Sequence, residues 1–184
     1  MFENYTIETA PENSKELLQK VFNKFNFIPN QDKILAVSPS IYQAYNQSFD
    51  LFLGQSSLGL LEGQIVLMTI SFENNSPYCM ALHSWGMEMT KVPKEIIDAL
   101  RNGEQIKDEK LEILRNFTVQ IIQKRGHIDE DELSNFLNAG YTKQNVIEII
   151  GGIATKTIAN LTNIIAKTPL DDSMTKYKWK PPNE

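Results

Sequence analysis

Helical periodicity runs through almost all of the 184 residues, and it is the feature that most limits the possible folds. Apolar residues recur at spacings of three and four, as in the segment from about Pro11 to Phe25, and no segment alternates apolar and polar residues as a half-buried strand does. We therefore predict an all-α fold. The length is that of one domain, with an N-terminal helical extension over about residues 1–30 and a C-terminal tail over about residues 169–184.

Residues that favour helix starts divide this pattern into helices. Serine precedes proline at Ser38-Pro39 and at Ser76-Pro77, so we expect both serines to be N-caps whose hydroxyls accept from backbone amides. We expect Ser57 to cap a helix that is apolar on nearly all sides and therefore central. Thr142 is expected to cap the last and longest helix.

The same periodicity predicts which faces are buried. On the helix that begins at Pro39 we expect four residues to face the core, namely Ile41, Tyr45, Phe49 and Phe52. The last helix carries an apolar band too wide for the surface of a monomer, so we expect it to be both core and subunit interface. This band comprises Val146, Ile149, Ile150, Ile153, Ile158, Leu161, Ile164 and Ile165. Gly151-Gly152 within it predicts the close approach of another helix.

Charge and hydropathy argue against two classes of partner. With 23 acidic and 18 basic residues the formal charge is −5, which repels a nucleic-acid backbone. The basic, aromatic stretch 176–180 is expected to be a tail whose rings dock on the domain or on a neighbouring subunit. Thr155, Lys156 and Asn160 interrupt the longest apolar run. We therefore expect neither nucleic acid nor a membrane as a partner.

The remaining polar residues point to no cofactor and to a reducing compartment. His127 has no cysteine or carboxylate at ligand spacing, and the acidic cluster 129–132 is typical of a first helical turn, so we predict no metal. The chain has no glycine-rich phosphate loop. Cys79 is the only cysteine, and the N-terminus lacks the pattern of a signal peptide. We therefore expect a cytoplasmic location.

Cys79 and His83 are the one pair of residues whose types and spacing suggest a catalytic role. Cys79 falls at about the third residue of the helix that begins at Pro77, and His83 follows four residues later on the same face. The start of a helix favours a thiolate, and an imidazole within reach can exchange its proton. This spacing is consistent with a nucleophilic cysteine, but a cysteine and a histidine at this spacing are more often two buried core residues.

The segment from Glu62 to His83 resembles the core motif of the alkylhydroperoxidase AhpD and carboxymuconolactone decarboxylase family. In that motif a glutamate precedes C-x-x-C and then x-x-x-H, and Cys79 matches the second cysteine. The likeness spans about residues 28–180, through Leu100–Gly103, Lys124–Gly126, Phe136–Thr142 and Thr168–Asp171. It implies an all-α fold that assembles into dimers, trimers or hexamers through its long helices.

The resemblance also implies residue roles, with three departures. Cys79 would attack a hydroperoxide, and His83 would belong to a proton relay. Ser76 replaces the first cysteine, so the internal disulfide cannot form. Gln64 stands where the family has its relay glutamate, and it orients groups but does not accept a proton at neutral pH. Ile164 replaces a histidine that the family often has.

Three further polar residues are candidates for substrate contacts, namely Tyr78, Asn160 and Asn163. For the two asparagines the alternative is hydrogen bonding between helices, because a buried amide needs partners.

The predicted function is therefore thiol peroxidase activity in a one-cysteine mode. Cys79 would reduce an alkyl hydroperoxide, become a sulfenic acid and be recycled by an external thiol or redox protein. One alternative is a carboxymuconolactone decarboxylase-like enzyme that does not need the cysteine. The other is an oligomeric binding or scaffold protein that has lost catalysis.

Overall fold

The computed structural model describes residues 2–182, in which every regular element is a helix and no strand occurs. The predicted all-α fold is therefore confirmed. The helices are α1 (Glu12–Phe25), α2 (Asn30–Leu35), α3 (Pro39–Gln55), α4 (Gly59–Glu73), α5 (Pro77–Met89), α6 (Lys94–Asn102), α7 (Glu109–Gln123), α8 (Glu130–Asn138), α9 (Lys143–Ala166) and the short 3-10 helix η1 (Asp172–Tyr177).

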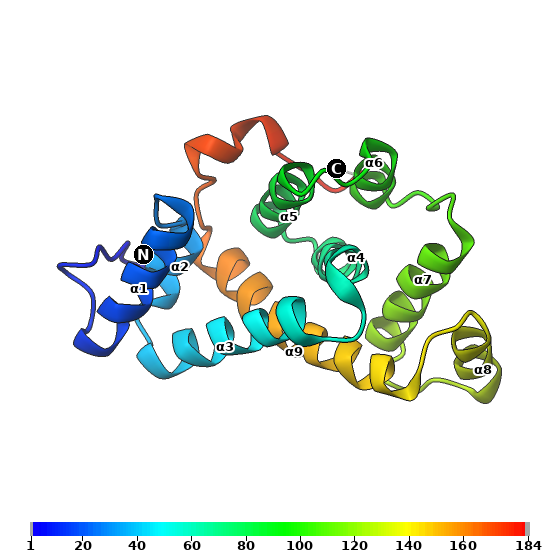
Figure 1. Ribbon diagram of the computed structural model, residues 1–184. Coiled ribbons are helices and arrows are strands. Elements are labelled where there is room, and N and C mark those ends of the chain that lie inside the picture. Colours follow the sequence, from blue (N-terminus) through cyan, green and yellow to red (C-terminus); the bar gives the residue numbers. More distant parts are fainter. Residues whose placement is uncertain (1, 183–184) are drawn as a thin grey trace.

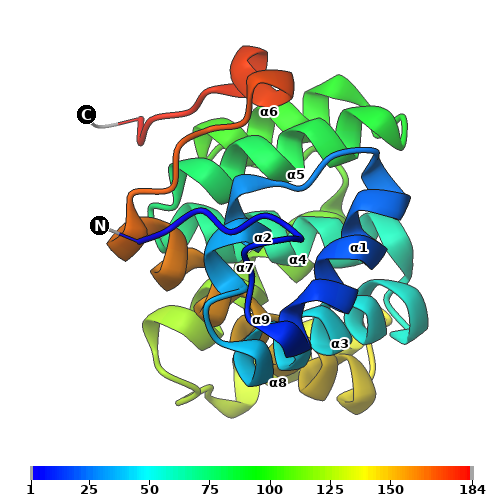
Figure 2. The same cartoon turned by 90° about the vertical axis from the view of Figure 1, so that its left-hand side faces the viewer.

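Helix α4 is the centre of the molecule. Every residue from 63 to 71 is buried, as expected for a helix that is apolar on nearly all sides. Figure 1 shows α4 with α5 above it and with α3 and α9 crossing below. Figure 2, seen from the side of α1 and α2, shows these two helices in front of α4 and α9. The chain thus surrounds one central helix.

The long helix α9 crosses α3 and α4 closely at Gly152. A Cβ atom there would lie 3.0 Å from the ring of Phe52 and 3.3 Å from Val66 Cγ1, so the predicted close approach is confirmed at this glycine. At Gly151 a Cβ atom would meet nothing within 4 Å. Helix α9 is long and apolar enough to span a membrane by length and composition. It packs against four other helices, which is the arrangement of a core helix.

The predicted caps divide into two groups. Asp129 and Thr142 accept from the amides of Glu132 and Asn145 and form complete capping boxes, so the cap at Thr142 is confirmed. Ser38 and Ser76 occupy the N-cap positions of α3 and α5 as predicted, but neither hydroxyl accepts a hydrogen bond from its helix. The two serines precede proline and have ψ of 93°, whereas the N-caps whose side chains accept, Asp108, Asp129 and Thr142, have ψ of 117°, 168° and 165°.

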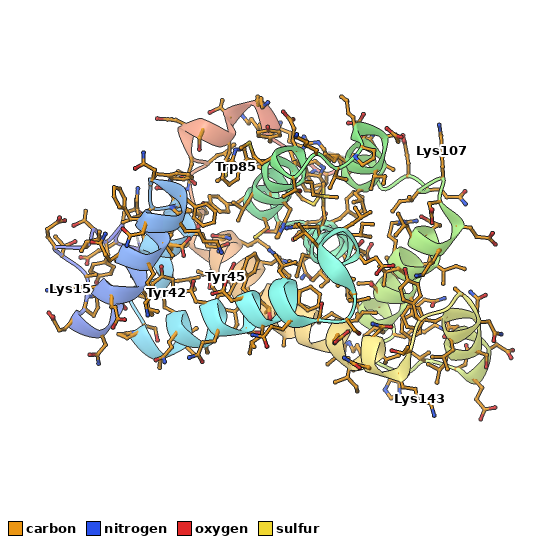
Figure 3. The ribbon with its side chains drawn as sticks, in the orientation of Figure 1. Lys15, Tyr42, Tyr45, Trp85, Lys107 and Lys143 are labelled. Carbon is orange, nitrogen blue, oxygen red and sulfur yellow. The ribbon has the colours of Figure 1, made fainter. Side chains whose placement is uncertain are left out.

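Two other local predictions are corrected. Ser57 does not cap α4, which begins at Gly59; it bonds the carboxylate of Glu148 instead. Ile41 is 47% exposed, and Tyr42 takes its place on the buried face of α3. Figure 3 shows Tyr42 and Tyr45 on the side of α3 that faces the interior. Tyr42 can be buried because its hydroxyl donates to a buried carboxylate, a contact between α2 and α3 that periodicity alone does not reveal.

The C-terminal segment packs back on the domain. The Trp179 ring is buried against Phe72, and its indole N–H donates to the carbonyl of Arg101 at 2.7 Å. The Arg101 guanidinium in turn donates to the carbonyls of Tyr177 and Lys178. Trp179 of the basic stretch thus docks on α4 and α6, and the Tyr177 ring packs on α5.

Candidate active site

The site is built where α5 faces α4 and α9. Pro77 is the first residue of α5, so Cys79 lies in its first turn and His83 one turn later on the same face. Both side chains are buried, with Cys79 at 0% and His83 at 3% exposure. Gln64 of α4 lies opposite His83. The structure therefore brings together Gln64, Cys79 and His83.

The two ring nitrogens of His83 have different partners. Nδ1 lies 3.0 Å from Gln64 Oε1, and Nε2 lies 2.8 Å from Lys156 Nζ. An amide oxygen only accepts, so Nδ1 is assigned the hydrogen and Nε2 accepts from the lysine. Burial, followed by the charge of Lys156, lowers the pKa of His83 well below 6.5. The imidazole is therefore neutral at pH 7.

The sulfur of Cys79 lies among polar groups. Asn163 Nδ2 of α9 donates to Sγ at 3.2 Å, and Gln31 Oε1 of α2 lies 3.7 Å from Sγ. The same amide of Asn163 donates to Gln31 Oε1 at 2.7 Å, while Gln31 Nε2 donates to the Tyr45 hydroxyl at 2.8 Å. The sulfur therefore has specific polar partners inside a cluster that is otherwise apolar and includes Leu18, Leu35 and Ala159.

A cavity of about 620 Å³ lies beside this network, between α1, α3 and α5. Its polar lining includes Gln31, Asp32, Gln64 and His83. Its apolar lining is formed by Leu17, Val21, Phe25, Phe49, Leu53, Leu82, Trp85 and Met89. Figure 3 shows one of these side chains, Trp85, on α5. Cys79 does not line the cavity, and Gln31 connects the two because it lines the cavity and hydrogen-bonds the sulfur.

Asp32 places a carboxyl group in the cavity lining. Its side chain is 7% exposed and accepts a hydrogen bond from the Tyr42 hydroxyl at 3.0 Å. Burial raises the pKa of Asp32 to about 7, although the Tyr42 hydrogen bond acts in the opposite direction. The carboxyl therefore changes charge near neutral pH.

The other predicted site residues lie in different surroundings. Ser76 is fully buried, and its hydroxyl has no hydrogen-bond partner among the described residues. The Tyr78 hydroxyl donates to Asp171 Oδ2 at 2.6 Å and does not line the cavity. Asn160 bonds Ser71 and the Ile70 carbonyl of α4, which is hydrogen bonding between helices. Only Asn163 of this group contacts the sulfur.

Sequence reasoning missed Gln31 and Lys156. In the sequence, Lys156 stood out only as a polar residue in an apolar helix. It lies on the inner face of α9 with Ile149, Gly152 and Asn163, and successive residues of this set are three, four and seven positions apart. A charged residue on the apolar stripe of a helix is the signal that could have found it. Gln31 follows a proline in a short helix, and its sequence carries no comparable signal.

The described residues hold no group of three or more histidine, cysteine, aspartate or glutamate side chains that could bind a metal ion. His127 is exposed, and the acidic residues 129–132 begin α8, as their sequence predicts.

Solved structures with the same architecture identify the fold. A peroxidase-related protein from Ralstonia eutropha JMP134, described as an alkylhydroperoxidase AhpD core, superposes with a TM-score of 0.83 over 94% of this chain and 93% of its own, at 16% identity. The chain has the AhpD-like fold. The resemblance noted in the sequence is thereby supported at the level of the fold.

Two further solved structures with this architecture widen the comparison. A peroxidase-related protein from Silicibacter sp. TM1040 has a TM-score of 0.72 at 18% identity, covering 88% of this chain and 85% of its own. The debrominase Bmp8 has a TM-score of 0.75 at 15% identity over 90% of each chain. A cysteine-to-alanine variant of Bmp8 has been solved with 2,3,4-tribromopyrrole. No protein-family model and no curated protein matches the sequence.

Proposed function

We propose that this protein is a thiol peroxidase that reduces an organic hydroperoxide through Cys79 without an internal disulfide. The observation that carries the proposal is the setting of the sulfur. It accepts from Asn163, lies in the first turn of α5, and is separated by Gln31 from a large, mostly apolar cavity. The AhpD-like fold of the peroxidase-related neighbours adds support from a separate direction.

The reaction divides into two half-reactions. The Cys79 thiolate attacks the terminal oxygen of the hydroperoxide, so an S–O bond forms, the O–O bond breaks, and the leaving alkoxide takes a proton to become an alcohol. Cys79 is then a sulfenic acid. An external dithiol attacks this sulfur and releases water, and its second thiol displaces Cys79 from the mixed disulfide. The external dithiol supplies both electrons, because Ser76 holds the position of a resolving cysteine.

The cavity favours an organic hydroperoxide over hydrogen peroxide. Apolar and aromatic side chains from α1, α3 and α5 form most of its lining, and such walls stabilise the carbon skeleton of a bound molecule. In this proposal the peroxide end lies near Gln64 and His83 and reaches the sulfur when the Gln31 side chain rotates away.

The test is detection of Cys79 sulfenic acid by mass spectrometry after addition of cumene hydroperoxide. The wild-type protein should form a trappable sulfenic acid at Cys79 much faster than free cysteine does. Cys79→Ser should form none, and His83→Ala should react more slowly. The matched control is His127→Ala, because His127 is exposed and far along the chain, and it should behave as wild type.

Oxidation no faster than that of free cysteine would contradict the proposal. If Cys79 also resists alkylation in the native protein, a binding or scaffold function becomes the better explanation of the fold. Turnover of a carboxymuconolactone by Cys79→Ser at the wild-type rate would favour the decarboxylase alternative.

We also propose that the chain forms a homo-oligomer through α9. Along its outer side this helix exposes large apolar residues, which are Ile147, Ile150, Leu161, Ile164 and Ile165. Exposed apolar surface of this extent is typical of an interface. Light scattering should give a mass that is a multiple of 21.0 kDa, and Ile165→Lys should lower it. A wild-type mass equal to one chain would refute the proposal.

A further inference from the structure

Lys156 occupies an unusual position for a lysine. It lies on the inner face of α9, one turn from Gly152 and from Asn160, and its side chain is 0% exposed. Moving an ammonium group out of water costs several kcal/mol unless partners replace the lost hydration. The groups around Nζ therefore determine which form of this amine the fold can hold.

The one neutral partner of Nζ is the imidazole of His83, at 2.8 Å from Nε2. The hydrogen on Nδ1 is held by Gln64, so Nε2 offers a lone pair to the lysine. This contact orients the amine but brings no negative charge. A buried ammonium at Lys156 still needs an anion.

Carboxylates do not supply that anion. No aspartate or glutamate within residues 2–182 forms an ion pair with Lys156. On the helices packed against α9, the buried carboxyl of Asp32 is bonded by Tyr42. Glu62 and Glu73 at the two ends of α4 are bonded by Tyr141 and Gln123.

The remaining ionisable groups of the site are Tyr45 of α3, whose hydroxyl accepts from Gln31, and the two site residues of α5. Burial raises the pKa of Tyr45 well above 10, so its phenol stays neutral. His83 is neutral for the reason given above. Burial lowers the pKa of Lys156, while the charge of Cys79 and a hydrogen bond with it act in the opposite direction. Cys79 lies one turn before His83 on α5, and Asn163 of α9 donates to its sulfur, so the thiol faces the same part of α9 as the amine. Cys79 is thus the group that can supply a negative charge to the buried amine.

We propose that Lys156 is the catalytic proton partner of Cys79, taking the thiol proton and pairing as an ammonium with the thiolate. Transfer of the thiol proton to a neutral amine makes both groups ionic without changing the net charge of the interior. The inference deepens the proposed peroxidase function, on which its second half rests.

The second half returns the proton. When the thiolate attacks the hydroperoxide, the S–O bond forms and the O–O bond breaks, which leaves an alkoxide in the cavity. Lys156 gives a proton to His83 Nε2 while Nδ1 releases its own proton to the alkoxide, so the products are an alcohol, a sulfenic acid and a neutral lysine. His83 and Gln64 both line the cavity, which places this relay between the buried amine and the substrate.

The first experiment needs no peroxide. The ultraviolet absorbance of the thiolate is followed against pH in wild type, Lys156→Met and Lys156→Arg, with Cys79→Ser as the blank. In Lys156→Met the thiolate should appear at a pH about one to three units higher than in wild type, as expected for loss of an adjacent opposite charge. Lys156→Arg should restore part of the difference, because it keeps the positive charge.

The matched control is Lys143→Met, which removes an exposed lysine from the first turn of the same helix. Its thiolate should appear at the wild-type pH. If Lys156→Met and Lys143→Met titrate alike, the proposal is wrong. Should Lys156→Met fail to fold, the titration of Lys156 can be measured instead, by nuclear magnetic resonance of the lysine side chains. Lys156 should lose its proton at lower pH in Cys79→Ser than in wild type. An unchanged titration of Lys156 would refute the proposed ion pair.

The two proposals can fail separately. A thiolate that depends on Lys156 but forms no sulfenic acid with cumene hydroperoxide would leave the ion pair standing and refute the peroxidase. With an active peroxidase, the pH profile of sulfenic acid formation should shift in Lys156→Met in the same direction as the thiolate absorbance. A profile that stays in place would show that Lys156 does not act in the reaction.

Discussion

Two parts of the interior are packed in opposite ways. Around α7 and α8 the rings of Phe117, Phe136 and Tyr141 stack on one another, with centroids 4.1 and 4.6 Å apart. Between α2, α5 and α9 several buried side chains are instead polar or ionisable, and Lys156 and His83 lie in direct contact. The first part gains stability from apolar burial, whereas the second holds groups whose burial is costly.

The difference shows that the fold keeps buried polar groups, which lower its stability, at the candidate active site. Buried polar groups persist when they are held by specific partners, and here the partners come from helices far apart in the chain. Substitutions in the apolar part should therefore lower stability without changing the reactivity of Cys79. Substitutions in the polar part should change stability or reactivity by amounts that depend on pH. Three predictions test this separation.

The largest effect should come from the aromatic stack. Phe136 is fully buried between Phe117 and Tyr141. Phe136→Ala should lower the free energy of unfolding by about 3–5 kcal/mol, through lost burial and the cavity that remains. Urea unfolding measures the loss, and the native protein should keep the wild-type pH dependence of Cys79 alkylation. A changed thiol titration would show that the two parts are coupled.

The next effect depends on pH and comes from Asp32. Its pKa is raised to about 7 in the fold, so the native state holds a proton that the unfolded state releases, and stability falls as pH rises from about 4 to 7. Asp32→Asn removes this loss. Relative to wild type the variant should therefore be more stable at pH 8 than at pH 4, by roughly 4 kcal/mol at most, since one pH unit is worth about 1.4 kcal/mol.

The control for this prediction is Asp50→Asn, an exposed residue that also lines the cavity. Urea unfolding of each variant and of wild type at the two pH values isolates the Asp32 contribution, because the titrations of His83 and Lys156 are common to all three proteins. An equal difference at both pH values would rule out a native proton on Asp32.

The smallest effect separates two helix starts that look alike in sequence. Thr142 accepts from the amide of Asn145, so Thr142→Ala should cost about 1 kcal/mol. The Ser76 hydroxyl is buried without a partner, and Ser76→Ala should cost nothing, because an unpaired buried hydroxyl is itself unfavourable by about 1–3 kcal/mol. Thermal unfolding of the pair measures the contrast. An equal loss in both variants would contradict it.

The local fold was largely predictable. Periodicity identified the central helix α4 and the long helix α9, because their apolar residues follow the helical repeat along the chain itself. The sequence placed Ser38 and Ser76 at helix N-caps correctly, but it did not show that their hydroxyls leave the first-turn amides without a bond. Both have a ψ of 93°, set by the proline that follows, which is lower than at the caps that do accept.

The site was predictable only in part. The Cys79 and His83 pair is four residues apart on one helix, so helical geometry alone places both side chains on one face. Gln31 and Lys156 reach that pair from residues 48 positions before Cys79 and 73 positions after His83. No local pattern records such contacts.

The sequence by itself determined the helices, the central place of α4 and the common face of Cys79 and His83, because these follow from spacings of three and four residues. The tertiary structure decided which groups surround the sulfur, because it brings α2, α4 and α9 against α5. Three amide side chains meet at the site, and a lysine with no carboxylate partner among residues 2–182 lies against His83. The physical reason is that hydrogen bonding and desolvation in the interior depend on neighbours in space, which packing of distant segments creates.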